Sequence, residues 1–473
     1  MTVEPESTQA KWLMAAVSMA LFCVQIDYFA MNLALPRMAT DFGSTAADLQ
    51  WIVSIYMLTL GALMVPAGRI ADIFGRKRAL MSGIALFGVA SLLCAIAPSV
   101  GMLIAFRALQ GVGAALIFPA SVSVLTNAFA PVQAGRMIGL AYGIAGLGNA
   151  AGPMIGGFLT QTVGWRWIFA LNIPLTVACV IIGAFSISES RDTNAPRRID
   201  LAGLGLLTAG IGVFTLTFDR APAWGWLSMA TVGALTGALA LLALFVLVER
   251  RVRWPLVDLS LVRDVRFAVL VAAGTTANVA YGVTIFLSTL YLQVVRGLDP
   301  LTAGLVFLGP SAGAAVGGVL SGRLAARSPV RVMGVTTILA ALSLALLAAA
   351  RGWALYLPAL TACGFTLGLV YAFTTVATQA VVRPERAGEA AGIALTSMIT
   401  MAGVGVAVAG TLVGTLRGGD SSTGGAISVI FAVLAAALLA AGIFVLAVSA
   451  RTAASTHVDA GIDVDDRRQN REP

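Results

Sequence analysis

The sequence predicts an all-α polytopic membrane protein with fourteen transmembrane helices. Of its 473 residues, 59% are hydrophobic and only 11% are charged, whereas a soluble domain has about 25% charged residues. Fourteen apolar runs are each long enough to cross a hydrocarbon core of roughly 30 Å, at about 1.5 Å per helical residue. Lysine and arginine gather in every second loop, as expected when those loops lie in the cytoplasm.

The polar loops between the apolar runs define the spans. In chain order we expect them at residues 12–35, 50–68, 79–97, 101–126, 137–160, 166–187, 200–218, 227–248, 267–292, 301–322, 331–350, 353–380, 388–416 and 425–449. With the amino terminus in the cytoplasm, the inner segments carry 23 of the 30 Lys and Arg residues, and the outer loops carry six. This asymmetry predicts a multi-pass protein of the cell inner (plasma) membrane with both termini cytoplasmic.

A short repeat divides the spans into two halves. GRIADIFGRKR at 68–78 follows the second span of the first half, and GRLAARSPVR at 322–331 follows the second span of the later half. The halves are not chemically equivalent, because Ala326 stands where the first repeat has Asp72. Two related halves with a site between them is a common transporter plan. We therefore expect a six-helix bundle at 1–188, two inserted transmembrane helices and a linker at 189–265, a second six-helix bundle at 266–450 and a disordered cytoplasmic tail at 451–473.

Asp27 is the one acidic residue that we place deep inside a predicted span. A carboxylate there costs about 2.5–3.5 kcal/mol on insertion scales, so we favour a role in proton coupling over an aspartate that only hydrogen-bonds a neighbouring helix. Arg107, in the fourth span, lies at a depth that differs by only ~3 Å. If the two spans are neighbours, Arg107 stabilises the carboxylate while burial disfavours it, and this opposition suits a proton site. The alternative is an arginine that extends alone to the interface.

The loop at 68–78 combines two glycines, an acid and a basic cluster that includes Arg76. Gly68 and Gly75 allow a tight turn and a close approach of helices. Asp72 can pair with an arginine or lie against the amino-terminal end of another helix. Either contact predicts a latch that holds one conformation, and the alternative is a loop that only fixes the topology.

The fifth span contains GIAGLGNAAGPMIGG at 143–157, which leaves a nearly bare helix face. Small residues four apart let helices touch closely, and the proline bends the helix. We expect a tight, kinked contact that closes one end of the transport path. The residues concerned are Gly148, Gly152, Pro153, Gly156 and Gly157.

Polar and aromatic residues within the spans are candidates for contact with a large amphiphilic ligand. Each of them is also compatible with simple helix packing. Gln110 shares a helical face with Arg107 by its i, i+3 spacing. We assign substrate contact to Asp27, Tyr28, Met31, Asn32, Gln110, Asn278, Tyr281 and Tyr371.

Together these stretches resemble the major facilitator superfamily, and specifically its fourteen-helix drug:proton antiporters. The similar motifs are the loop between helices 2 and 3 (Gly68, Asp72, Gly75, Arg76, Lys77), the helix-4 motif linked to proton coupling (Leu103, Arg107, Gln110, Gly111, Gly113), the helix-5 antiporter motif (Gly148, Gly152, Pro153, Gly156, Gly157) and the helix-1 motif of the fourteen-helix branch (Asp27, Asn32, Ala34, Leu35, Pro36). The resemblance implies a major facilitator fold of two six-helix bundles plus two inserted helices. It also implies proton-coupled export of drugs, antibiotics or dyes by alternating access.

Departures from the family pattern occur at three places, and one of them is Ala326 in the second-half loop, where an acid could have been. Tyr28 and Phe29 follow Asp27, where the family more often has a small or hydroxyl residue, and this bears on the shape of the pocket. Asn127 ends the fourth span without an acid, which argues against a charge relay from Asp72 through that span.

The composition limits which ligands, cofactors and macromolecular partners we expect. The single histidine, His457, lies in the tail and the four cysteines lie in apolar runs, so we expect no metal site and no cofactor. The net charge of +8 fits cytoplasmic loops that face anionic lipid, and we expect no nucleic-acid partner. No phosphate-cradling loop is present, so we do not expect ATP as the energy source, nor enzymatic activity. The expected partners are a small-molecule substrate, protons and the bilayer, with a functional monomer.

Three other functions are compatible with parts of the pattern. The nearest alternative is a dedicated exporter of one endogenous metabolite or lipid. Proton-coupled uptake is disfavoured by the glycine–proline pattern of the fifth span. A membrane sensor that transports nothing would need a sizeable soluble domain, and no loop is long enough for one.

Overall fold

The computed structural model describes residues 4, 6–31, 34–44, 46–192, 200–324, 328–417 and 423–469. Within these ranges, fourteen helices are long and apolar enough to cross a membrane. Each of them overlaps one of the predicted spans, which confirms the fourteen-helix prediction. Ala326, which stands in the second repeat where the first repeat has Asp72, lies outside the described residues.

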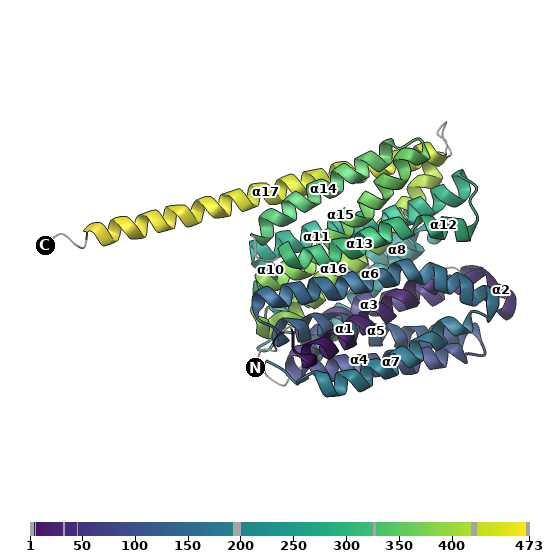
Figure 1. Cartoon of the computed structure of the whole chain (residues 1–473), viewed down its shortest axis with the longest axis horizontal. Helices are drawn as coiled ribbons and strands as arrows, with labels where there is room; N and C mark the ends of the chain where they lie inside the picture. Colours follow the sequence, from purple (N-terminus) through teal and green to yellow (C-terminus); the bar gives the residue numbers. More distant parts are fainter. Residues whose placement is uncertain are drawn as a thin grey trace.

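The helices of the first half lie together as one bundle (Figure 1). They are α1 (Thr8–Met31), α2 (Leu35–Phe42), α3 (Ala46–Phe74), α4 (Arg76–Ala95), α5 (Val100–Ala128), α6 (Pro131–Thr162) and α7 (Arg166–Ser186). Their buried apolar side chains, including Leu21, Tyr56 and Phe87, form a continuous core.

The second half forms another bundle beside the first (Figure 1). Its elements are α11 (Val265–Leu290) with the π-helical turn η1 (Tyr291–Val295), α12 (Pro300–Val306), α13 (Leu308–Leu324), α14 (Pro329–Ala349), α15 (Trp353–Ala380), the 3₁₀ turn η2 (Pro384–Arg386), α16 (Ala387–Arg417) and α17 (Thr423–Gln469). A second core, with Leu344, Phe373 and Phe431 among its members, holds these helices together.

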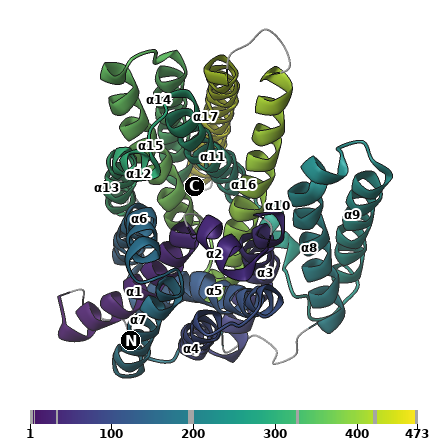
Figure 2. The ribbon, with the colours of Figure 1, turned by 90° about the vertical axis from the view of Figure 1, so that its right-hand side faces the viewer.

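The two inserted helices, α8 (Leu201–Trp224) and α9 (Met229–Glu249), stand to one side of the two bundles (Figure 2). Leu207, Ile211 and Phe245 pack in a small core with apolar residues of α3. α8 contacts both α3 of the first half and α16 of the second half. The inserted pair therefore covers the seam between the halves on this side.

Helix α1 begins and α17 ends on the same side of the molecule (Figure 1). We call this side the terminal face, and we call the opposite side, which carries α2 and α12, the far face. An even number of crossings places the two chain ends on one side. The predicted cytoplasmic location of both termini would assign the terminal face to the cytoplasm.

Two segments differ from the sequence prediction. Helix α2 forms where we expected a loop, and it ends at Gly43, whose φ of 59° is the left-handed conformation typical of a helix end. Helix α17 continues to Gln469, where we expected a disordered tail over residues 451–473. Helix elongation is far easier than nucleation, so a helix formed in the membrane can continue into the alanine-containing sequence that follows.

Candidate functional site

A cavity of about 1310 Å³ lies between the two halves. Its walls come from α1, α3 and α6 of the first half, from α11, α13, α15 and α16 of the second half, and from α8. The cavity extends to the far face, where Trp51, Gln293 and Thr415 line it. Apolar and aromatic side chains with a few amides and hydroxyls dominate the walls, which suits a large amphiphilic ligand.

Four of the predicted substrate-binding residues line this cavity, namely Tyr28, Asn278, Tyr281 and Tyr371. Three others, Asp27, Met31 and Gln110, are buried and do not line it. In this conformation their side chains pack between helices of the first half, so their assignment to substrate contact stays a prediction. Asn32 lies outside the described residues.

Asp27 is the centre of a buried polar cluster. Arg107 Nη1 donates a hydrogen bond to Asp27 Oδ2 at 2.6 Å, and both side chains are fully buried. Gln110 Nε2 donates to Asp27 Oδ1 at 3.0 Å, and Asn172 Nδ2 donates to the same oxygen at 2.8 Å. A buried charge is tolerated when it is paired and hydrogen-bonded. These three donors therefore satisfy both carboxylate oxygens of Asp27.

Four helices of the first half supply the cluster. Asp27 comes from α1, Arg107 and Gln110 from α5, and Asn172 from α7. Ser91 of α4 accepts a hydrogen bond from Gln110 Nε2 at 2.8 Å. The expected approach of the first and fourth spans is thus present, with the arginine directed at the aspartate and not at the interface.

Two tyrosines separate the Asp27 cluster from the cavity. The guanidinium carbon of Arg107 is 4.1 Å from the centre of the Tyr56 ring. The Tyr56 ring stacks with that of Tyr28 at a centroid distance of 6.4 Å, and both tyrosines line the cavity. Asp27 therefore lies one layer of side chains behind the cavity wall.

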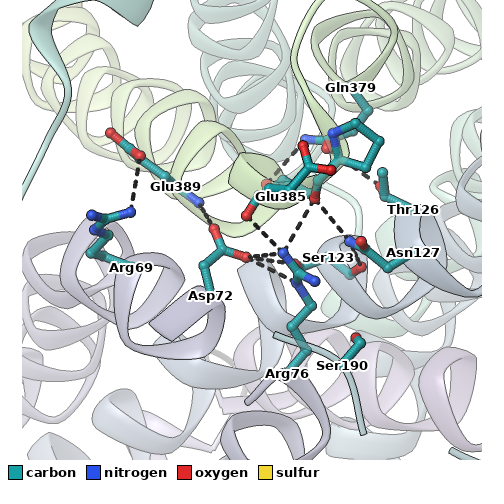
Figure 3. A network of polar contacts seen from close by, with 12 residues as sticks. Arg69, Asp72, Arg76, Ser123, Thr126, Asn127, Ser190, Gln379, Glu385 and Glu389 are labelled. Carbon is teal, nitrogen blue, oxygen red and sulfur yellow. Dashed lines mark hydrogen bonds and ion pairs between the residues drawn. The ribbon is translucent and has the colours of Figure 1, made fainter. Parts of the chain in front are cut away.

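At the terminal face, Asp72 connects the two halves (Figure 3). Its Oδ1 accepts hydrogen bonds from Arg76 Nε at 2.9 Å and from Ser123 Oγ at 3.0 Å. Its Oδ2 accepts from the backbone N–H of Glu389 at 2.9 Å. Glu389 lies in the first turn of α16, so Asp72 faces the positive end of a helix of the other half. The sequence analysis gave an arginine and a helix terminus as alternative partners of Asp72, and Asp72 contacts both.

Arg76 extends this connection across the seam. Its Nη2 donates to the carbonyl oxygens of Pro384 at 3.2 Å and Glu385 at 2.7 Å, and Asn127 Nδ2 donates to the Pro384 carbonyl at 3.0 Å. Figure 3 shows these groups converging on η2. The chain turns into α4 at Gly75, whose φ of 125° favours glycine.

Close contacts between glycines of the two halves complete the closure of the terminal face. A Cβ atom on Gly68 of α3 would lie 2.0 Å from the carbonyl oxygen of Gly388 on α16. A Cβ atom on Gly139 of α6 would lie 2.7 Å from the backbone nitrogen of Gly322 on α13. Both distances are shorter than real Cβ contacts, so the two halves touch here only because these positions are glycine.

A comparison with protein-family models identifies the fold family. The model described as the Major Facilitator Superfamily matches residues 17–398 and 267–463. The chain belongs to the major facilitator superfamily. The predicted fold class is thereby confirmed, and this superfamily member is a multi-pass membrane protein of a transporter family.

Curated members of the superfamily are similar over most of the chain. The multidrug resistance protein Stp of Mycobacterium tuberculosis (strain CDC 1551 / Oshkosh) is 34% identical over 84% of this chain and 74% of its own length. The tetracenomycin C resistance and export protein of Streptomyces glaucescens is 32% identical, over 86% of this chain and 76% of its own. The puromycin resistance protein pur8 of Streptomyces alboniger is 33% identical, over 85% and 81% respectively.

A solved structure of a major facilitator protein has the same fold. The crystal structure of the human organic anion transporter MFSD10 (TETRAN) matches with a TM-score of 0.67, over 93% of this chain and 100% of that chain. The sequence identity is 12%, so the match concerns the fold alone.

In this superfamily member, the glycines of the predicted antiporter motif face α1. A Cβ atom on Gly152 would lie 2.6 Å from Phe29 Cβ, and one on Gly156 would lie 2.4 Å from the carbonyl oxygen of Ala30. Gly148 packs against Phe22 in the same way. The contact between the halves is instead made earlier in α6, by Gly139 and by Gly143. The remaining motif members are Gly157, which is half-buried, and Pro153, which lies within α6 but has no described side-chain environment.

Two members of the Asp27 cluster were missed on the sequence. Ser91 and Asn172 are single polar residues within long apolar runs, and this isolation was the available signal. Apolar runs contain several such residues, and their spacing does not reveal which of them meet Asp27.

The linker that returns from the inserted helices joins the same turn of α16 that Asp72 contacts. Asp258, the N-cap of α10 (Leu259–Arg263), donates from its backbone N–H to Glu389 Oε1 at 2.6 Å and forms an ion pair with Arg386. Partial burial raises the pKa of Asp258, but hydrogen bonds from Ser260 and the Arg386 pair outweigh it, and the pKa lies below its ordinary value. The stabilising charge of Asp258 is therefore present at neutral pH and is lost only as the pH falls through that lowered pKa.

Proposed function

We propose that this protein exports amphiphilic small molecules, such as drugs, antibiotics or dyes, from the cytoplasm in exchange for protons. The observation that carries the proposal is the fully buried Asp27–Arg107 pair one side-chain layer behind a large, mostly apolar cavity. An ionisable pair inside a membrane domain marks a proton or substrate pathway by default. The names of the similar proteins, which include multidrug resistance and antibiotic export, support the choice of substrate class.

In this proposal Asp27 is the proton carrier and Arg107 is its counter-charge. Protonation of Asp27 from the far face removes the partner of a buried guanidinium, which is then costly to keep in place. The cluster ties α1 to α5 and α7, so a change in its charge favours a different packing of these helices. Release of the proton on the cytoplasmic side restores the pair.

The contacts at the terminal face allow the cavity to open alternately to the two sides of the membrane, because they can form in one state and break in the other. The closed terminal end and the cavity that extends to the far face belong to one of two states of an alternating-access cycle. Asp72, Arg76 and the glycine contacts act as the latch of this state. Each proton that moves inward contributes about 2.3 kcal/mol per 100 mV of membrane potential, in addition to the pH gradient.

Purified protein in proteoliposomes is expected to accumulate ethidium only while a proton gradient is imposed. A gradient of about two pH units can sustain about hundredfold accumulation at one proton per substrate, since tenfold in concentration corresponds to one pH unit. The measurement is the ethidium concentration inside the vesicles, before and after an ionophore dissipates the gradient. Accumulation that survives the ionophore contradicts proton coupling. Failure of a whole panel of dyes and antibiotics instead favours the dedicated exporter of one endogenous compound.

A further inference from the structure

Helix α8 supplies part of the cavity wall, although it belongs to neither six-helix bundle. Ser54 Oγ of α3 donates a hydrogen bond to Asp219 Oδ1 of α8 at 2.8 Å. Just after α8, Trp226 Nε1 donates to Thr411 Oγ1 of α16 at 3.0 Å. The far end of α8 is thus tied to both halves, at the seam where the cavity would otherwise approach lipid.

One face of α8 points into the cavity. Thr215, Asp219 and Pro222, spaced i, i+4 and i+7, all line it. Asp219 is the only residue with a formal charge among the described residues of the lining. The sequence prediction ended this span at residue 218 and therefore placed Asp219 in the outer loop, whereas the helix continues to Trp224.

In this structure a cation of the protein itself already occupies the space beside Asp219. Arg220 Nε lies 3.4 Å from Asp219 Oδ2, and the Arg220 guanidinium carbon is 3.7 Å from the centre of the Trp51 ring. Neither Arg220 Nε nor Nη2 has a hydrogen-bond partner in the described part of the chain, and Asp219 Oδ2 accepts none. The carboxylate and the indole therefore contact this cation by charge and by its ring face, which are interactions that an organic cation can reproduce.

We propose that Asp219 makes the cavity selective for amphiphilic cations, with the positive group of the substrate placed between the Asp219 carboxylate and the Trp51 and Trp226 rings. The proposal rests on the proposed export function and specifies its substrate class. Asp219 is 25% exposed and lines the cavity, whereas Asp27 is fully buried behind Tyr28 and Tyr56. Substrate charge and proton are thus received by two different carboxylates. Arg220 competes with the substrate for Asp219.

The test uses two substitutions with opposite expected effects. Binding of ethidium, a cationic dye, and of Nile red, an uncharged dye, is measured by fluorescence titration of the purified full-length protein. Asp219→Asn is expected to raise the Kd for ethidium about tenfold, by removal of a charge-assisted contact, and to leave the Kd for Nile red unchanged. Arg220→Gln is expected to lower the Kd for ethidium, because the competing cation is gone. Asp264→Asn is the matched control, because it changes an exposed acid at the N-cap of α11 into an equally good cap.

The outcomes separate this inference from the function on which it rests. Unchanged ethidium binding in Asp219→Asn, or equal weakening for both dyes, overturns the inference, since equal weakening indicates only a structural role through Ser54. If such a variant still accumulates ethidium under a proton gradient, the proposed export function stands. If the wild-type protein binds and transports neither dye, both proposals fail. Ethidium affinity close to the wild-type value in Asp219→Glu, which keeps the negative charge, supports a role for the charge of Asp219 in binding the cation.

Discussion

Replacing Asp27 with asparagine is expected to abolish proton-driven accumulation of substrate while the protein still folds and binds ligand. Asparagine has nearly the shape of a protonated aspartate, and it keeps an oxygen that can accept from Gln110 and Asn172. It cannot exchange a proton. The accumulation ratio in vesicles with an imposed pH gradient should therefore fall to one, with ligand affinity little changed because Asp27 does not line the cavity.

The same variant is expected to be less stable than the wild type. Removing one partner of a buried ion pair leaves the other charge uncompensated, which typically costs about 3–5 kcal/mol. A lower midpoint of thermal unfolding, together with a monodisperse elution profile, would separate this cost from misfolding. Asp264→Asn should behave like the wild type in both assays. Accumulation in Asp27→Asn at the wild-type level would show that another group carries the proton.

Replacing Gly68 with valine is expected to prevent closure of the terminal face. Even the first side-chain atom at this position would lie 2.0 Å from the carbonyl oxygen of Gly388, a distance that the rigid backbone cannot accommodate. Overpacking of this kind costs about 1–3 kcal/mol, which shifts a two-state equilibrium by a factor of about 5 to about 150. The population of the state that is open toward the far face should fall by this factor relative to the state that is open toward the terminal face.

Thiol labelling from the far face can measure this shift. A cysteine introduced at Thr289, which lines the cavity, should react with a membrane-impermeant reagent much more slowly when Gly68→Val is also present. The four native cysteines are buried, so the background should be low. Gly205→Val is the matched control, because a Cβ atom at Gly205 meets nothing within 4 Å. Equal labelling with and without Gly68→Val would mean that the α3–α16 contact does not set the equilibrium.

The pairing of Asp27 with Arg107 could be predicted because both residues are charged within apolar spans and lie at similar depths. Depth is readable from a sequence, since each residue of a helix advances about 1.5 Å. The rotation of each helix about its axis relative to its neighbours is not readable in this way. For that reason Met31 and Gln110 were assigned to the cavity but lie behind its wall, and Asn172 was missed as a partner of Asp27.

The same limit explains the glycines of α6. The sequence shows a bare helix face over residues 143–157 and predicts close packing, which is present. It does not show that Gly152 and Gly156 face α1 of the same half, while Gly139 and Gly143 face α13 of the other half. These two sets of glycines lie on one helix, and only the positions of α1 and α13 distinguish their roles.

The sequence by itself determined the fourteen crossings and the presence of a charge pair in the first half. The physical reason is that backbone polar groups in hydrocarbon must be satisfied within a helix, so apolar length alone specifies the spans. Only the tertiary structure decided which polar residues meet. It places Asp72 against the first turn of α16, and it joins the linker to the same turn through Asp258. It also brings Asp219 of an inserted helix to the cavity wall. These contacts depend on the register and rotation of helices that are far apart in the chain, which no local pattern encodes.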